Sequence, residues 1–295
     1  MQSLACNTTA KTRVSSLTSD TAPTQPEMNF MLWNCRGANN TDFRRNFRLL
    51  LDYHGPTLVV LFETHMHDHT VLCDDFHFTN FYKVPATGQA GGIVLLWHDN
   101  VLAVENLAMT EQEVHVMIQV FPNPQKWLFP AIYASPHYHT CRLLWRNLMY
   151  LADTYKGPWL VRGDFNEILC STEKFGGRPI SNPRSSRFAD YLNYCQLVDL
   201  AYTGSKYTWT NKRHYGSNIL ERLDRILANY DWITLFPEAS VRHLPRTHSD
   251  HNPLLLTFHS PYPQQINPFV LKLSGPLTLI LSIFSAIAGI ARKVY

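Results

Sequence analysis

The sequence predicts a layered α/β domain. Short apolar runs of strand length recur along the chain between clusters of turn-forming residues. Other stretches repeat their apolar residues with helical spacing, which is typical of helices that cover a sheet. Polar side chains directly follow several of the apolar runs. Because strand ends in layered α/β sheets meet at one rim, we expect a site there.

The composition is that of a chain that can form a sizeable core. Of its 295 residues, 45% are hydrophobic and 17% are charged, and the formal net charge of +3 does not by itself indicate a nucleic-acid binder. The six cysteines form no CxxC pair, which argues against a disulfide framework or a zinc knuckle. We therefore expect a reducing, intracellular location, and the start of the sequence has no apolar stretch typical of a secretory signal.

Composition divides the chain into three parts. Residues 1–27 are rich in Ser and Thr and lack apolar periodicity, which predicts disorder, with a weak organelle transit peptide as the alternative. Residues 28–260 contain the predicted strands and helices. Residues 261–295 begin as a Pro-containing linker and continue into an apolar tail. A surface-packed helix or an evolutionary leftover is favoured for this tail over a membrane anchor.

The first half of the domain is predicted to be mostly strands. A helix begins at Asn40 or Thr41, with Phe43, Phe47 and Leu50 on its apolar face. Strands are expected at residues 29–33, 57–62, 93–97, 101–104, 114–120 and 127–134. Turn residues separate the last four strands, so we expect these four to be antiparallel neighbours in one sheet.

The second half mixes helices and strands. Residues 140–155 have the periodicity of an amphipathic helix, and the buried strand at 158–161 should end where Gly163 turns the chain. Residues 171–185 form a polar loop, and a helix starts at Arg187. Further strands are expected at residues 207–211, 219–227, 241–244 and 254–258, with a short helical piece around Trp232.

Polar residues at the ends of apolar runs are the candidate site. They are Asn34, Glu63, Tyr133, Asp164, Asn166, Asp250 and His251. In extended chain Asp164 and Asn166 point to the same side, where a carboxylate and an amide can hold an attacking water and a phosphate oxygen. Either one alone could be an ordinary turn residue. Asp224, an acid inside an apolar strand, requires a partner.

Three histidines at alternate positions, His65, His67 and His69, lie with Asp68 in a polar segment. This spacing could form a separate zinc site. Histidines that simply face water are the favoured interpretation.

Six short motifs in fixed order identify a family resemblance. WNCRG, LFETH, YASP, GDFNE, RLDR and SDHNP resemble the endonuclease/exonuclease/phosphatase superfamily, which includes abasic-site endonucleases, DNase I and inositol-polyphosphate 5-phosphatases. The phrases EKFGGRP, YTWTN, ERLDR and HLPRTHSDH are most similar to the endonuclease domain of plant LINE-type retrotransposons. The resemblance covers about Met28 to Phe258. It implies a four-layer α/β sandwich of two packed, mostly antiparallel sheets flanked by helices.

The resemblance also implies a metal site. By position, Glu63 is the main ligand of a Mg²⁺ ion, with Asn34 beside it and Asp250 supporting the metal or the water. Mg²⁺ prefers one or two carboxylates together with waters and substrate oxygens, which suits this sparse set of acids. Arg36 departs from the pattern, because abasic-site nucleases usually carry an acid or amide there. This departure puts the detail of metal binding and abasic-site activity in doubt, and an arginine there could instead reach a phosphate.

Catalytic roles follow from the same positions. Asp164 is implied to orient or deprotonate the attacking water, while Asn166 and Tyr133 hold the phosphate. His251 is implied to stabilise charge on the phosphoryl oxygens, oriented by Asp224. A histidine with one nitrogen held by a carboxylate keeps a fixed tautomer and can stay protonated near neutral pH.

We therefore expect a Mg²⁺-dependent phosphodiesterase that nicks DNA in the nucleus. Mn²⁺ is the alternative ion and RNA the alternative substrate, and no obligate protein partner is evident. Tyr207 or Trp209 could pack or contact bases. Basic residues expected to contact the nucleic-acid backbone are Arg36, Arg178, Arg184, Lys212, Arg213, Arg242 and Arg246.

Two other functions stay open. A phosphatase of inositol phosphates or lipids is favoured slightly by the apolar tail, which could contact a membrane, but the retrotransposon-like phrases count against it. The second open function is that of a retroelement remnant that binds nucleic acid without cutting it. Filled catalytic positions count against this reading, and the unusual C-terminal segment counts for it.

Overall fold

The computed structural model describes residues 27–259, apart from residues 89 and 215. The predictions for residues 1–26 and 260–295, including the apolar tail, lie outside the described residues. No helix of the described part is long and apolar enough to cross a membrane.

The first sheet has seven strands in the order β11-β15-β16-β1-β2-β4-β3. Its central strands β2 and β4 are buried at every position, because both faces of the sheet are covered there. The seven strands are β1 (Glu27–Asn34), β2 (Leu58–Phe62), β3 (Asn80–Val84), β4 (Ile93–Trp97), β11 (Tyr202–Gly204), β15 (Ser240–His243) and β16 (Leu254–His259).

The second sheet has six strands in the order β10-β14-β8-β7-β6-β5, and a small third sheet has the order β12-β13-β9. The six are β5 (Leu102–Met109), β6 (Glu113–Val120), β7 (Lys126–Tyr133), β8 (Leu160–Asp164), β10 (Val198–Asp199) and β14 (Asp224–Ala228). The small sheet consists of β9 (Lys174–Phe175), β12 (Trp209–Thr210) and β13 (Leu220–Glu221).

Two strand predictions were wrong in how they grouped the strands. Of the four strands expected to be neighbours, β4 pairs with β2 and β3 in the first sheet, while β5, β6 and β7 form an antiparallel run in the second. The segment expected as one strand at 219–227 divides into β13 and β14, which belong to different sheets. It breaks because the N–H of Arg222 bonds to Glu173 O and that of Leu223 to Thr208 Oγ1, outside any strand ladder.

Helices form the two outer layers, except for the short helix at Tyr230–Leu235, whose Trp232 packs into the core between the sheets. Helix α1 begins at an N-cap, where Asn40 Oδ1 accepts a hydrogen bond from Phe43 N at 2.7 Å, and ends at Gly55 in the left-handed conformation. Helix α4 begins five residues earlier than Arg187, with a proline in its first turn. The segments are α1 (Thr41–His54), α2 (Thr70–Asp75), α3 (Tyr138–Thr154), η1 (Ser171–Glu173), α4 (Asn182–Tyr194) and α5 (Tyr230–Leu235).

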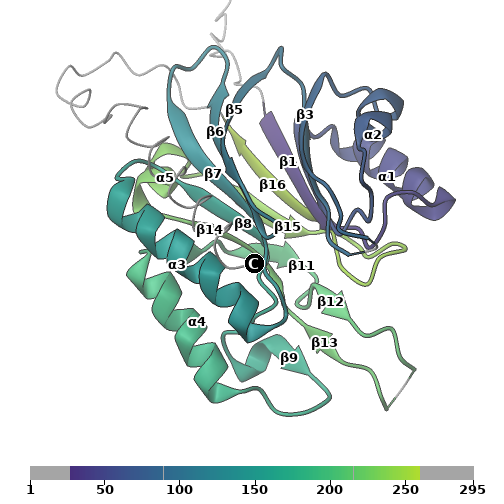
Figure 1. Ribbon diagram of the computed structural model, residues 1–295, viewed down its shortest axis with the longest axis vertical. Helices are drawn as coiled ribbons and strands as arrows, with labels where there is room; N and C mark the ends of the chain where they lie inside the picture. Colours follow the sequence, from purple (N-terminus) through teal and green to yellow (C-terminus); the bar gives the residue numbers. More distant parts are fainter. Residues whose placement is uncertain (1–26, 89, 215, 260–295) are drawn as a thin grey trace, which may run out of the picture.

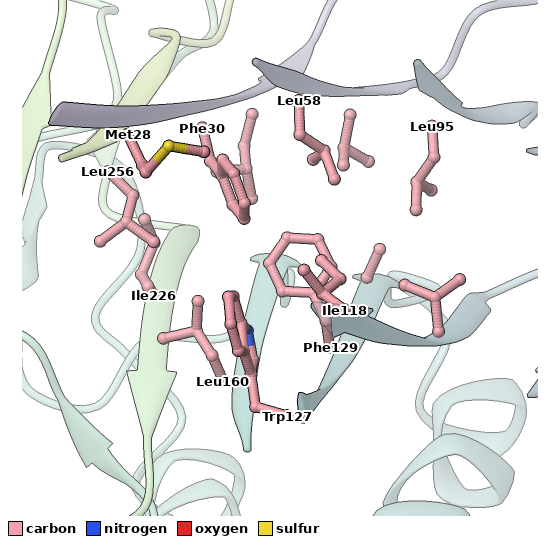
Figure 2. Packing of buried hydrophobic residues seen from close by; sticks show 14 of the residues in the cluster. Met28, Phe30, Leu58, Leu95, Ile118, Trp127, Phe129, Leu160, Ile226 and Leu256 are labelled. Atoms are coloured by element: carbon pink, nitrogen blue, oxygen red, sulfur yellow. The ribbon is translucent and has the colours of Figure 1, made fainter. Parts of the chain in front are cut away.

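These elements stack as four layers. In Figure 1, α1 and α2 cover the outer face of the first sheet, and α3 and α4 cover the outer face of the second. Between the sheets lies a core to which both contribute. Figure 2 shows Met28, Phe30, Leu58 and Leu95 of one sheet facing Ile118, Trp127 and Phe129 of the other. The chain is thus a four-layer α/β sandwich, as predicted.

Strand direction decides which strand ends meet. Strand β1 runs parallel to β2, and β7 runs parallel to β8. Strand β14 is antiparallel to β8, with Asp224 opposite Asp164. The C-terminal ends of β1, β2, β7 and β8 and the N-terminal end of β14 can therefore place their polar residues along one edge.

Candidate active site

Asp164 lies at the centre of the polar cluster at this edge. It is the last residue of β8 and is buried, at 1% exposure. Its Oδ2 accepts a hydrogen bond from Asn34 Nδ2 at 3.0 Å and lies 3.8 Å from His251 Nε2. Burial raises the pKa of Asp164 above its usual range, and the charge on His251 and the Asn34 amide oppose this shift. The carboxyl is thus suited to exchange a proton near neutral pH.

The backbone around Asp164 differs from the prediction. The strand does not end at Gly163 but runs through it, with Gly163 at φ 147°. A Cβ there would lie 1.8 Å from the carbonyl oxygen of Ile132, so glycine lets β7 and β8 approach. Asn166 is not extended but left-handed, at φ 49°, so its side chain does not simply repeat the direction of Asp164.

Asn166 is instead positioned by two local hydrogen bonds. Its backbone N–H donates to Asp164 Oδ1 at 3.0 Å, and its Nδ2 donates to Ala134 O at 2.8 Å. This leaves the second N–H of the side-chain amide for another acceptor.

His251 and Asp224 form a buried pair. His251 Nδ1 lies 2.8 Å from Asp224 Oδ2, so Nε2 is the nitrogen that faces Asp164. Burial would lower the pKa of His251, but the carboxylates of Asp224 and Asp164 outweigh it and raise the pKa to about 9. His251 therefore carries a positive charge at neutral pH.

Two hydroxyl residues that sequence reasoning did not single out hold this pair. Ser249 Oγ donates to Asn34 O at 2.7 Å and accepts from His251 N at 3.1 Å, which ties the loop before β16 to the end of β1. Thr208 Oγ1 accepts from the N–H groups of Leu223 and Asp224 at 3.0 Å, which fixes the start of β14. The SDHNP motif contains Ser249, so motif position could have indicated it. The YTWTN phrase likewise contains Thr208.

A buried ionic network contacts β14, the strand that begins at Asp224. Arg222 and Arg225 both pair with Glu173 and Asp199, and Arg225 Nη1 lies 2.7 Å from Asp199 Oδ2. Glu173 follows the GDFNE motif in the stretch that was expected to be a polar loop. The network therefore ties that stretch to β14 and helps to place Asp224.

Glu63, Asn34 and Tyr133 form the neighbouring half of the cluster. Asn34 Nδ2 donates to Glu63 Oε1 at 2.8 Å as well as to Asp164, and Tyr133 hydrogen bonds to Glu63. Burial opposes ionisation of Glu63, but the hydrogen bond from Asn34 and the charge of Arg36 hold its pKa below the usual value. Burial and the charges of Glu63 and Asp164 raise the pKa of Tyr133, so its hydroxyl stays a donor.

Arg36 and His65 also contact Glu63. Arg36 Nη1 lies 3.0 Å from Glu63 Oε2, and Arg36 Nε lies 3.3 Å from Asp250 Oδ1. His65 Nε2 lies 3.5 Å from Glu63 Oε2 and was missed as a site residue, since it was grouped with the other histidines. Asp250 also accepts a hydrogen bond from Trp209 Nε1 at 3.0 Å.

The oxygen atoms around Glu63 fit a divalent cation. Asn34 Oδ1 is buried and has no hydrogen-bond partner among the described residues, while Nδ2 of the same amide donates to Glu63 and Asp164. An amide oxygen beside carboxylates is a ligand set that suits Mg²⁺. Arg36 contacts the carboxylates of Glu63 and Asp250 as well, so a bound ion would share these two carboxylates with the arginine.

Other metal arrangements are less suitable. Asp164, Asp224 and His251 lie close enough together to share an ion. No other group of three acids, histidines or cysteines does so among residues 27–259, leaving out 89 and 215. A protonated His251 bonded to Asp224 has no free lone pair to ligate with. The histidines at 65, 67 and 69 do not form such a group. His69 is buried against Thr64 Oγ1 at 2.7 Å, and Asp68 pairs with Lys83.

The predicted nucleic-acid residues fall into two classes. Lys212 and Arg213 are exposed in the connection between β12 and β13, where Lys212 Nζ also donates to the backbone oxygen of His248, and Arg178 and Arg242 are exposed elsewhere. The other arginines are held by the protein. Arg184 lies in α4, not in a loop, and its Nε donates to Glu167 at 2.7 Å, while Arg246 Nη2 donates to Asn252 Oδ1 at 2.9 Å.

A protein-family model described as the endonuclease/exonuclease/phosphatase family matches residues 31–251, which include every residue of this cluster. The chain belongs to the endonuclease/exonuclease/phosphatase family. This family consists of hydrolases of phosphodiester bonds that typically depend on a divalent metal ion. No curated protein matches the sequence significantly.

Solved structures of low sequence identity share the family fold. The AP endonuclease LMAP from Leishmania major has a TM-score of 0.63 at 14% identity, over 86% of this chain and 93% of that one. The endonuclease domain of TRAS1, a telomere-specific non-LTR retrotransposon, has a TM-score of 0.58 at 14% identity, over 79% and 99%. A 3′ phosphatase from Neisseria, bound to a product DNA hairpin, has a TM-score of 0.57 at 18% identity, over 78% and 99%.

Proposed function

We propose that this protein is a Mg²⁺-dependent endonuclease that nicks DNA and that derives from a LINE-type retroelement. The observation that carries the proposal is the position of a protonated His251 beside Asp164, held by Asp224. A cationic donor beside a carboxyl of raised pKa suits attack on an anionic phosphodiester, which needs both a base and charge stabilisation. The likeness to AP endonucleases, a DNA-bound 3′ phosphatase and a retrotransposon endonuclease domain supports the choice of DNA.

Each residue has a defined task in this proposal. Asp164 orients the attacking water and accepts its proton, and the positive charge of His251 stabilises the negative charge that builds on the phosphoryl oxygens. Asp224 holds His251 in one tautomer. The free N–H of Asn166 and the hydroxyl of Tyr133 donate to phosphate oxygens.

Glu63 would hold the metal ion together with Asn34 Oδ1 and Asp250. The bound ion supplies Lewis-acid chemistry, withdrawing charge from the phosphate. Lys212 and Arg213, exposed between β12 and β13, contact the DNA backbone.

A plasmid assay tests the proposal. The full chain is incubated with supercoiled plasmid in Mg²⁺ or in EDTA, beside Asp164→Ala and His251→Ala. We expect nicking that requires Mg²⁺ and is lost in both variants, by at least about 10²-fold. Arg45→Ala, a change on the exposed side of α1, should nick as the wild type does.

No nicking by folded wild-type protein would reject the endonuclease. The same preparations would then be assayed for phosphate release from inositol phosphates and for DNA binding by gel shift. These two measurements separate the phosphatase from the non-catalytic binding protein.

A further inference from the structure

Arg36 bridges two acidic residues that belong to different parts of the chain. Its Nη1 lies 3.0 Å from Glu63 Oε2 and 3.3 Å from Oε1, at the end of β2. Its Nε lies 3.3 Å from Asp250 Oδ1, in the loop before β16. One guanidinium thus spans two carboxylates, as a divalent ion shared by them would.

The local backbone directs the side chain into this position. Arg36 follows Asn34 at the end of β1 and has a left-handed φ of 52°, which is unusual for a residue with a Cβ. Glu63, at φ 50°, is also left-handed. Two such conformations at facing strand ends are maintained when surrounding contacts favour them, and the bridge between these residues is one such contact.

The charges of Glu63 and Asp250 give the bridge its electrostatic purpose. Their side chains are 8% and 12% exposed, so a nearby positive charge offsets the cost of burying each carboxylate. Arg36 supplies that charge, and the two carboxylates raise its own pKa despite partial burial.

Arg36 is not locked in place. Its side chain is 49% exposed, whereas that of Arg225, which pairs with Glu173 and Asp199, is completely buried. Arg36 can therefore turn toward solvent without opening a cavity in the core. Beside Arg36, Asn34 Oδ1 is a buried acceptor without a donor among the described residues. Movement of the Arg36 guanidinium away from Glu63 would leave this oxygen still free to accept.

We propose that Arg36 is an internal cation that competes with a divalent metal ion for Glu63 and Asp250, so that the ion binds only when the Arg36 side chain leaves this pair. The inference rests on the proposed function in one respect, the assignment of Glu63 and Asp250 as metal ligands. It adds that a side chain of the protein itself contacts the carboxylates that would hold the ion.

Direct measurement of metal binding tests this. Mn²⁺ is titrated into the full-length protein without nucleic acid, and free Mn²⁺ is followed by electron paramagnetic resonance. Arg36→Ala should bind the ion at least about tenfold more tightly than the wild type, because the positive charge that contacts the same two carboxylates is removed. Adding Glu63→Gln to Arg36→Ala should abolish the gain.

Two further variants make the result specific. Arg45→Ala removes the same charge from the exposed side of α1 and should leave Mn²⁺ affinity unchanged. Arg36→Gly removes the side chain and suits the left-handed backbone, so it serves if Arg36→Ala does not fold. Thermal unfolding first shows that both Arg36 variants are folded. If the folded variants bind Mn²⁺ no more tightly than the wild type, or not measurably, the proposal is overturned.

The outcome is separate from that of the plasmid assay. Tighter Mn²⁺ binding by the Arg36 variants without nicking by the wild type would reject the endonuclease and retain the internal cation. Nicking by the wild type with unchanged Mn²⁺ affinity in the variants would retain the endonuclease and reject the internal cation.

Discussion

The imidazole of His251 donates from Nδ1 to Asp224 Oδ2, at 2.8 Å, although the two residues lie 27 positions apart in the chain. Asp224 is the first residue of β14 in the second sheet, and His251 lies just before β16 in the first sheet. The pair therefore joins the two sheets at the edge where the polar cluster lies. Its consequences for charge, stability and catalysis can be measured separately.

Replacing Asp224 by Asn should lower the pKa of His251. Burial lowers the pKa of His251, and the Asp224 carboxylate opposes burial both by its charge and by its hydrogen bond, so without that carboxylate the pKa should fall below about 9. An NMR titration of the His251 ring measures this directly. A pKa that stays near 9 in Asp224→Asn would show that another group carries the effect.

The same change should alter how stability depends on pH. Since the folded pKa of His251 lies above its ordinary value of 6.5, its protonation stabilises the fold fully below pH 6.5, and the contribution is lost as pH rises through about 9. Denaturant unfolding of wild type and Asp224→Asn across that range should show this loss in the wild type alone.

Gly163→Ala should destabilise the protein severely. Its Cβ would lie 1.8 Å from Ile132 O at a φ of 147°, so β7 and β8 would have to separate. We expect a loss of at least about 3 kcal/mol, measured by urea denaturation. Gly55→Ala is the matched control, since Gly55 is also left-handed but has nothing within 4 Å of the added Cβ, and it should cost about 1 kcal/mol. Similar losses in both variants would contradict this account of Gly163.

Arg162→Met should stabilise the protein. Arg162 lies completely buried over the Phe129 ring, and none of its guanidinium nitrogens has a hydrogen-bond partner among the described residues. Burial alone lowers the pKa of Arg162, which expresses the cost of an uncompensated charge. Methionine keeps much of the volume without the charge, so we expect a gain of about 1–4 kcal/mol in denaturant unfolding.

Arg225→Met provides the contrast for that measurement. Arg225 is equally buried but pairs with Glu173 and Asp199, so its removal takes one of the two arginine charges, those of Arg222 and Arg225, away from two largely buried carboxylates. This variant should lose about 3–5 kcal/mol. A stabilised Arg225→Met or a destabilised Arg162→Met would show that pairing is not what distinguishes the two arginines.

Lys212→Ala and Arg213→Ala should each reduce the salt dependence of DNA binding. If each side chain neutralises one phosphate, the slope of log affinity against log salt should become less steep by about 0.9 per variant. Fluorescence anisotropy at several salt concentrations measures the slope. Lys156→Ala, at the opposite end of β8 from Asp164, should leave it unchanged. An unaltered slope in both hairpin variants would place the DNA elsewhere.

Local features of the sequence were sufficient for the fold class and for many elements. The Asn40 cap, the apolar spacing of Phe43 and Phe47 and the uncharged run of β2 are properties of neighbouring residues. Motif order then indicated the family and the residues that cluster at the sheet edge. Such signals are readable because capping, periodicity and turn chemistry act over a few positions.

The tertiary structure decided what depends on contacts between distant segments. It placed β4 in the first sheet, divided 219–227 between two sheets, gave Asn166 a left-handed backbone and held Arg184 against Glu167. It also set Arg36 between Glu63 and Asp250 and left the guanidinium of Arg162 without a hydrogen-bond partner among the described residues. Strand partners, ion pairs and pKa values follow from which groups meet in space, and the order of residues along the chain does not specify this.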